Sequence, residues 1–182
     1  MSIKLVTPLT PLHIVAKTTN TFTTFQDISP TPALLIPQQT LEQGLEIELY
    51  AAGNFSNTAT PTLQIGFWFN TAATVLAANA LTTTVTTAVS WPWQAWYRGR
   101  LTVTTPGASA TFLGQGEVKV GGSLTAWATG FPAPIPVTAA ARTVTVDTTA
   151  ARAVGVGAAW GASSVSNTIT VDTLSCLLIS GL

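Results

Sequence analysis

Apolar and polar side chains alternate along much of the chain after residue 44. In the sequence LEIELYA, which begins at Leu45, aliphatic residues alternate with Glu46 and Glu48. Successive side chains of a β-strand point to opposite faces of its sheet, so this pattern predicts a strand with one buried face. The sequence TLQIGFWF, from Thr62 to Phe69, alternates in the same way with larger side chains, and we expect it to form a central strand.

The same pattern predicts eight strands in this part of the chain. Turn-forming residues separate them, among them Gly53, Asn54 and Asn57 after the first strand. We expect residues 72–81 to form at most one turn of helix and the proline-rich residues 131–137 to form a connection. The expected strands are residues 45–51, 62–69, 81–89, 94–103, 110–120, 143–147, 153–160 and 167–179.

Eight short strands with turns every 8 to 12 residues or so are typical of a two-sheet sandwich, whose eight-stranded form is the jelly roll. We therefore predict an all-β fold, an antiparallel β-sandwich of jelly-roll type over residues 41–182. Its core should contain the residues of the alternating buried faces: Leu45, Ile47, Leu49, Leu63, Ile65, Phe67, Phe69, Val144, Val146, Val154, Val156, Ile169 and Val171.

Residues 1–40 differ from the rest because they carry five of the eleven prolines. Proline lacks a backbone donor and favours extended backbone, so we predict an extended N-terminal arm. Such a segment gains hydrogen bonds along an exposed strand edge of its own sandwich, of a neighbouring subunit or of a capsid. Our hypothesis is that the arm supplies the attachment or subunit contact; the alternatives are an arm folded only on its own domain and a disordered tail. The possible apolar anchors are Ile3, Leu5, Leu12, Ile14, Phe22 and Phe25.

Charged residues are rare, and this narrows the choice of partners. They make up 8% of the chain, against about 25% in an ordinary soluble domain, and seven basic residues balance seven acidic ones. Nucleic-acid binding requires a basic surface, so we expect no nucleic-acid partner. Apolar runs are too short for a membrane-spanning helix, and prolines interrupt the N-terminal run, so we expect neither a membrane partner nor a signal peptide.

The chain contains one cysteine, Cys176, and one histidine, His13. A single cysteine cannot form an internal disulfide or a multi-cysteine zinc site, and a single histidine excludes sites that need two imidazoles. Glu46 and Glu48 share one strand face, as on a solvated surface. We therefore expect a non-enzymatic protein with no catalytic residues, no metal ion and no cofactor.

A segment rich in tryptophan and arginine, SWPWQAWYRGR, begins at Ser90. Protein interfaces and sugar-binding surfaces both use aromatic rings and guanidinium groups. Three interpretations stay open, namely packing at the end of the sandwich, a subunit or partner interface, and a glycan platform. The candidate interface residues are Trp91, Trp93, Trp96, Arg98 and Arg100.

The sequence VDTTAARAVGVGAAWGASSVSNTITVDTLSCLLI, from Val146 to Ile179, resembles the closing strands of small jelly-roll virion proteins of tailed bacteriophages. In those proteins a D-T-T turn leads to a strand that ends in Ala-Trp-Gly, followed by a small-residue loop and an N-T-I-T strand. The motif carries no catalytic residues. The resemblance implies a head-decoration or tail-associated protein, a class whose members are commonly homotrimers.

Together these observations favour a non-enzymatic structural protein of a bacteriophage virion, assembled in the cytoplasm of the bacterial host. We expect a capsid decoration protein that binds the major capsid protein or another virion protein and stabilises the head lattice. A homotrimer is expected because identical neighbours most simply cover an uncharged, threonine-rich surface. The alternative is a carbohydrate- or receptor-binding module of a phage tail or fibre.

Overall fold

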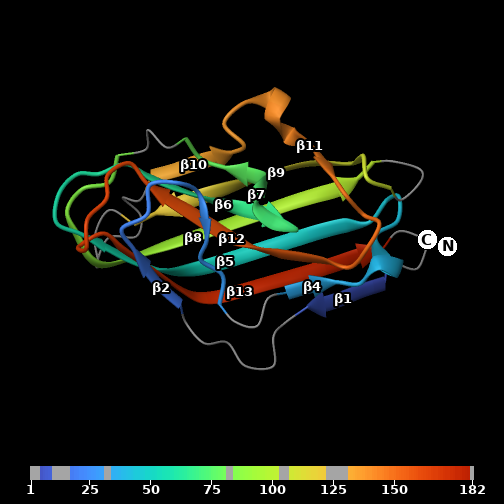
Figure 1. The fold of residues 1–182 in the computed structure, drawn as a ribbon, viewed down its shortest axis with the longest axis horizontal. Helices are drawn as coiled ribbons and strands as arrows, with labels where there is room; N and C mark the ends of the chain where they lie inside the picture. Colours follow the sequence, from blue (N-terminus) through green and yellow to red (C-terminus); the bar gives the residue numbers. More distant parts are fainter. Residues whose placement is uncertain are drawn as a thin grey trace.

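Two antiparallel β-sheets packed face to face form the body of the protein (Figure 1). The computed structural model describes residues 5–9, 17–30, 34–80, 84–102, 107–121 and 131–180. The predicted all-β antiparallel sandwich is therefore confirmed. None of the helices in the described ranges is long and apolar enough to cross a membrane.

The larger sheet contains eight of the described strands. They are β1 (Leu5–Leu9), β2 (Lys17–Asn20), β5 (Glu46–Asn57), β8 (Ala88–Leu101), β9 (Ala110–Val120), β10 (Phe131–Ile135), β11 (Thr143–Val146) and β13 (Thr168–Ser180). Six of them follow one another in the order β1, β13, β5, β8, β9, β10, while β2 also pairs with β13 and β11 with β9.

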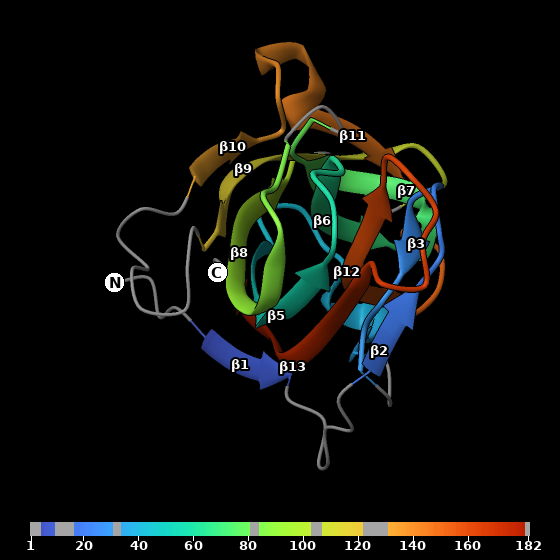
Figure 2. The same cartoon turned by 90° about the vertical axis from the view of Figure 1, so that its left-hand side faces the viewer.

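The smaller sheet contains five of the described strands and covers the inner side of the larger one. They are β3 (Gln26–Asp27), β4 (Leu34–Ile36), β6 (Leu63–Phe69), β7 (Thr71–Ala78) and β12 (Arg152–Trp160). Their order is β3, β12, β6, β7, and β4 also pairs with β12. Figure 2 shows the two layers from the side, with β8 and β9 on one side and β3 and β7 on the other. Two short 3₁₀ helices, η1 (Gln38–Thr40) and η3 (Ala139–Arg142), lie in connections.

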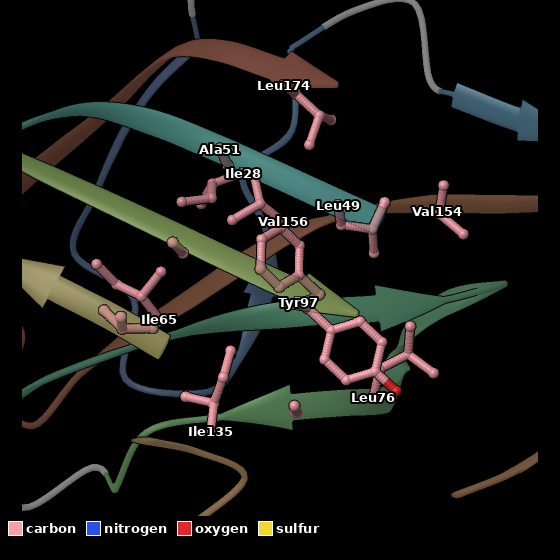
Figure 3. Packing of buried hydrophobic residues seen from close by; sticks show 14 of the residues in the cluster. Ile28, Leu49, Ala51, Ile65, Leu76, Tyr97, Ile135, Val154, Val156 and Leu174 are labelled. Carbon is pink, nitrogen blue, oxygen red and sulfur yellow. The ribbon is translucent and has the colours of Figure 1, made fainter. Parts of the chain in front are cut away.

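The hydrophobic core fills the space between the sheets (Figure 3). Aromatic side chains from opposite sheets contact one another there, and the ring centroids of Phe67 and Tyr97 are 6.3 Å apart. Those of Phe69 and Phe112 are 5.4 Å apart. Of the thirteen predicted core residues twelve are buried, and Val144 is partly buried against the same cluster. The alternating pattern therefore identified the inner faces of these strands correctly.

The segment expected to form a turn of helix is a strand instead. β7 pairs with β6 and buries Leu76 and Ala77. Just after it, the Asn79 side chain continues the pairing, because its Oδ1 accepts a hydrogen bond from Ile65 N at 2.6 Å. Its Nδ2 donates to the Leu63 carbonyl at 3.0 Å. Pairing with β6 thus outweighs the helix propensity of an alanine-rich sequence.

The turn predicted around Gly53 and Asn54 is wrong, because β5 runs unbroken to Asn57. Gly53 serves a different purpose in the sheet. A Cβ atom at this position would lie 1.9 Å from the backbone oxygen of Thr170 in β13. The glycine therefore permits the close approach of two strands rather than a reversal of the chain.

No separate strand covers the described part of the predicted strand 81–89, and its last two residues instead begin β8, which also contains most of the strand predicted at 94–103. β8 begins only at Ala88 and then continues through the tryptophan-rich segment. Residues 81–83 lie outside the described ranges. In the part that is described, Val85 N donates to the Pro61 carbonyl at 2.9 Å, and Thr84 forms an isolated bridge with Thr62.

The proline-rich connection predicted at residues 131–137 contains the strand β10. Pro132 and Pro134 lie opposite Lys119 and Glu117 of β9. Proline is tolerated here because β10 is the outermost strand of the sheet order, where a missing donor breaks no second ladder. The described part of the chain thus has nine strands after residue 44 rather than the predicted eight.

Strands from the proline-rich N-terminal region pair with both sheets of the same chain. β1 and β2 pair with the two halves of β13, and β3 and β4 pair with β12. Phe22, Ile28, Leu34 and Ile36 are buried in the common core. Much of the region between residues 17 and 36 therefore belongs to the sandwich.

Candidate binding surface

The outer face of the larger sheet carries a row of side chains that runs across its central strands. The strand register places Ser175 of β13 opposite Tyr50 of β5, and Tyr50 opposite Trp96 of β8. Trp96 in turn lies opposite Glu117 of β9. Tyr50 is 40% exposed and Trp96 is 44% exposed. We call Tyr50 and Trp96 the aromatic pair. Two large aromatic residues thus lie opposite each other on neighbouring strands of the outer face, each partly exposed to solvent.

Charged groups lie beside the aromatic pair in an ordered arrangement. The next residue of β8 on this face, Arg98, contacts Glu46 at 2.5 Å and Glu48 at 3.2 Å, both on β5. The hydrogen bond to Glu46, and the negative charges of both glutamates, raise the pKa of Arg98 above its ordinary value. The alternation that places these three side chains on one face follows from the period of two along each strand.

Three open hollows meet at Trp96. The first, about 650 Å³, lies over β13, β5 and β8 and is bordered by Tyr50, Ser175 and Leu177. The second, about 440 Å³, is bordered by Arg98, Arg100 and Leu113, among others. The third, about 750 Å³, lies between β9, β10 and the loop 136–142. That loop, which contains η3, projects from the body of the sandwich in Figures 1 and 2 and forms a wall of the third hollow.

The candidate interface residues of the tryptophan-rich segment divide between two environments. Trp96, Arg98 and Arg100 point outward from β8. Trp93 is only 1% exposed, and its Nε1 donates to the Thr170 carbonyl at 3.2 Å. Trp91 is partly buried in an edge-to-face contact with Phe55, with ring centroids 6.4 Å apart. Of the five candidate interface residues, Trp96, Arg98 and Arg100 therefore contribute side chains to the outer face.

The candidate arm anchors that the structure describes also lie in different environments. Leu5 lies in β1, opposite Ser180 of β13. Phe22 is buried in the core, and Phe25 is partly buried. The anchors Ile3, Leu12 and Ile14, together with His13, lie outside the described residues.

The outer face of the smaller sheet, in contrast, is covered by its own chain. Trp68 of β6 lies on that face yet is only 4% exposed, and its Nε1 donates to Asp27 Oδ1 at 3.2 Å and to the Val156 carbonyl at 3.1 Å. A Cβ atom at Gly157 would lie 2.3 Å from the ring of Phe25, which shows how closely that ring covers β12. The N-terminal strands thus supply the cover that Trp68 requires.

Two ionisable groups away from the outer face have shifted pKa values, Asp147 in a hydrogen-bonded turn and Cys176 in the core. Hydrogen bonds from Thr149 and Arg152 lower the pKa of Asp147 to about 2, in the turn of the D-T-T sequence between β11 and β12. Burial raises the pKa of the Cys176 thiol to about 12. Within the described ranges no group of three or more His, Cys, Asp or Glu side chains is placed to hold a metal ion.

Sequence reasoning missed Tyr50 as part of this surface. The signal was present, because Tyr50 continues the polar face that Glu46 and Glu48 begin. Its position beside Trp96 depends on the register between β5 and β8, which the two segments do not reveal separately. Neither a comparison with protein-family models nor one with curated proteins finds a match to this chain.

Proposed function

We propose that this chain is a non-enzymatic structural protein of a bacteriophage virion, of the capsid decoration type, that binds the head lattice as an oligomer. The observation that carries the proposal is the outer face of the larger sheet, where Tyr50 and Trp96 are 40% and 44% exposed. Exposed aromatic side chains of this size, gathered on one face, are typical of interaction surfaces. The low content of charged residues and the resemblance of residues 146–179 to phage virion proteins give further support.

A jelly-roll arrangement is part of this proposal. It is supported by the way in which the C-terminal strands β12 and β13 return beside the early strands β6 and β5, one pair in each sheet. Such a return of the chain end in both sheets is what two linked Greek keys produce. A homotrimer is also part of the proposal. The chain has too few charged residues to keep most of its surface well solvated, and identical neighbouring subunits can cover the uncharged area.

The proposal can be tested on virions of the phage that encodes the chain. Antibodies raised against the purified protein would be used for immunogold electron microscopy of intact particles. Gold particles spread over the head support a decoration protein, and labelling confined to the tail or its fibres contradicts it. Mass spectrometry of the same particles provides the control, because absence of the protein from purified virions would overturn any virion role.

A second candidate function is a carbohydrate- or receptor-binding module of a phage tail or fibre. The specific observation in its favour is that the aromatic pair lies beside the polar groups of Arg98 and Glu48, since sugars stack on rings and bond to such groups. A glycan array tests this function. Binding of the wild-type chain that Trp96→Ala abolishes would favour it, and the absence of any bound glycan would count against it.

A further inference from the structure

We infer that the outer face of the larger sheet is the surface through which copies of this chain associate, with Tyr50 and Trp96 at the centre of the contact. This inference rests on the oligomer of the proposed function and adds the location of its interface. The occupant of the face is thus a second copy of the same chain. Four features of the described residues support this assignment.

The first feature is the unequal covering of the two sheets. The smaller sheet buries Trp68 beneath the segment 25–29 of the same chain, whereas the larger sheet leaves the aromatic pair open. An aromatic residue that is about 40% exposed keeps apolar area in contact with water, and covering that area is favourable. The larger sheet therefore has the surface that gains most from a partner.

The second feature is the state of the charges at the centre of the face. Arg98 already has two acidic partners in its own chain, Glu46 and Glu48. Covering a charge that has no partner is costly, whereas a paired charge with its hydrogen bonds in place can be covered at lower cost. A second copy can therefore approach the aromatic pair without having to supply a counter-charge.

The third feature is the balance of charge over the rest of the face. β9 presents Glu117 and Lys119 with alternating sign, and the side chains of Arg100 and Arg142 border the second hollow. A face with both signs does not repel an identical face, in contrast to a surface of one sign.

The fourth feature is that the two halves of the face differ in shape. On the β9 and β10 side, the loop 136–142 forms a wall, and Leu113 and Val137 are 46% and 55% exposed. On the β13 side, the hollow is open and bordered by Leu177 and Ser175. Two unlike halves suit a heterologous contact, in which one half meets the other half of the next copy. Such contacts close into a ring, such as a trimer, when the rotation between successive copies closes.

The experiment is a measurement of molar mass by light scattering after size exclusion, for wild type and for Trp96→Thr. Threonine keeps the β-propensity of the strand and adds no charge beside Glu117. We expect the wild type at three times 18.9 kDa and the variant at 18.9 kDa at the same micromolar concentration. Loss of a central aromatic contact should weaken association by about 30-fold or more.

Matched variants separate the interface from general effects on folding. Leu35→Thr removes a 58% exposed side chain from β4 of the smaller sheet and should leave the trimer intact. Tyr50→Thr should act like Trp96→Thr, and Trp96→Phe should retain most of the association. Far-ultraviolet circular dichroism and the urea midpoint of each variant show whether the monomer is still folded. If one aromatic variant fails to fold, the other provides the test.

The possible failures point to different conclusions. A wild-type trimer that both aromatic variants preserve would overturn this interface and leave the oligomer standing. A wild type that is monomeric would overturn the interface together with the oligomer. A monomer that binds neutral oligosaccharides through Trp96 would assign the face to the second candidate function instead.

Discussion

Tyr97 of β8 lies over Gly114 of the neighbouring strand β9, on the inner side of the larger sheet. A Cβ atom at Gly114 would lie 2.2 Å from the hydroxyl oxygen of Tyr97 and 2.4 Å from the ring carbon that bears it. Gly99, which lies opposite Gly114 in the register of β8 and β9, also gives this ring space, because a Cβ atom there would lie 2.6 Å from the hydroxyl oxygen. Two glycines therefore make room for one buried aromatic ring that reaches Phe67 of the opposite sheet.

Gly114→Ala should destabilise the protein because the new methyl group overlaps the ring of Tyr97. Tyr97 is 1% exposed and packed from both sheets, so it cannot move aside without disturbing the core. Overpacking of this kind costs about 1–3 kcal/mol. Urea unfolding measures the loss. The control is Ala108→Gly, a single exchange between the same two residue types in an exposed turn away from the ring of Tyr97. An unchanged urea midpoint for Gly114→Ala would contradict the packing.

Tyr97→Phe should leave stability unchanged or raise it by about 1 kcal/mol. The Tyr97 hydroxyl is fully buried and has no hydrogen-bond partner among the described residues. Removing a buried polar atom without a partner relieves its desolvation penalty. Tyr97→Leu, which also removes the ring, is the matched control and should be clearly destabilising. A loss of more than about 1 kcal/mol in Tyr97→Phe would show that the hydroxyl is hydrogen-bonded.

Cys176 should make the folded protein less stable as the pH rises above 9. Burial raises the pKa of its thiol from 9.0 to about 12, so the unfolded chain loses this proton first. The unfolded state then binds fewer protons than the folded state, and the free energy of unfolding falls with rising pH, by at most about 1.4 kcal/mol per pH unit. Unfolding of wild type and Cys176→Ala would be compared from pH 8 upward. The wild type should lose stability relative to the variant, and a constant difference would contradict the prediction.

Asn79→Ala should destabilise the end of the smaller sheet. The Asn79 side chain bonds to Ile65 N and to the carbonyls of Leu63 and Ala80, and it is 1% exposed. Alanine would leave buried backbone groups of β6 without partners, at a cost of about 1–3 kcal/mol for each group. Asn20→Ala, at an exposed position at the end of β2, is the control. The urea midpoints of the two variants should differ clearly, and equal midpoints would show that the Asn79 contacts contribute little.

The sequence by itself determined the fold class and most of the core. Alternation at a period of two placed Ile47, Phe67 and Val156 on inner faces, because burying apolar area on one face of a strand leaves a pattern in the chain itself. It likewise separated Tyr97 from Trp96 and Arg98 on opposite faces of β8. These are local properties, and each can be recognised in a segment of about eight residues.

The tertiary structure decided which strands are neighbours. β7 is a strand because β6 lies beside it, and Gly53 is a point of close approach because Thr170 of β13 lies opposite. Tyr50 and Trp96 lie far apart in the sequence, and they form one surface only because the register of β5 against β8 places them opposite each other. Among the described residues, N-terminal strands cover the smaller sheet, while Tyr50 and Trp96 on the outer face of the larger sheet stay partly exposed. Backbone hydrogen bonds between strands depend little on side-chain identity, so the sequence contains little information about which strands pair. The pairing that does form is what brings Tyr50 and Trp96 together on one surface.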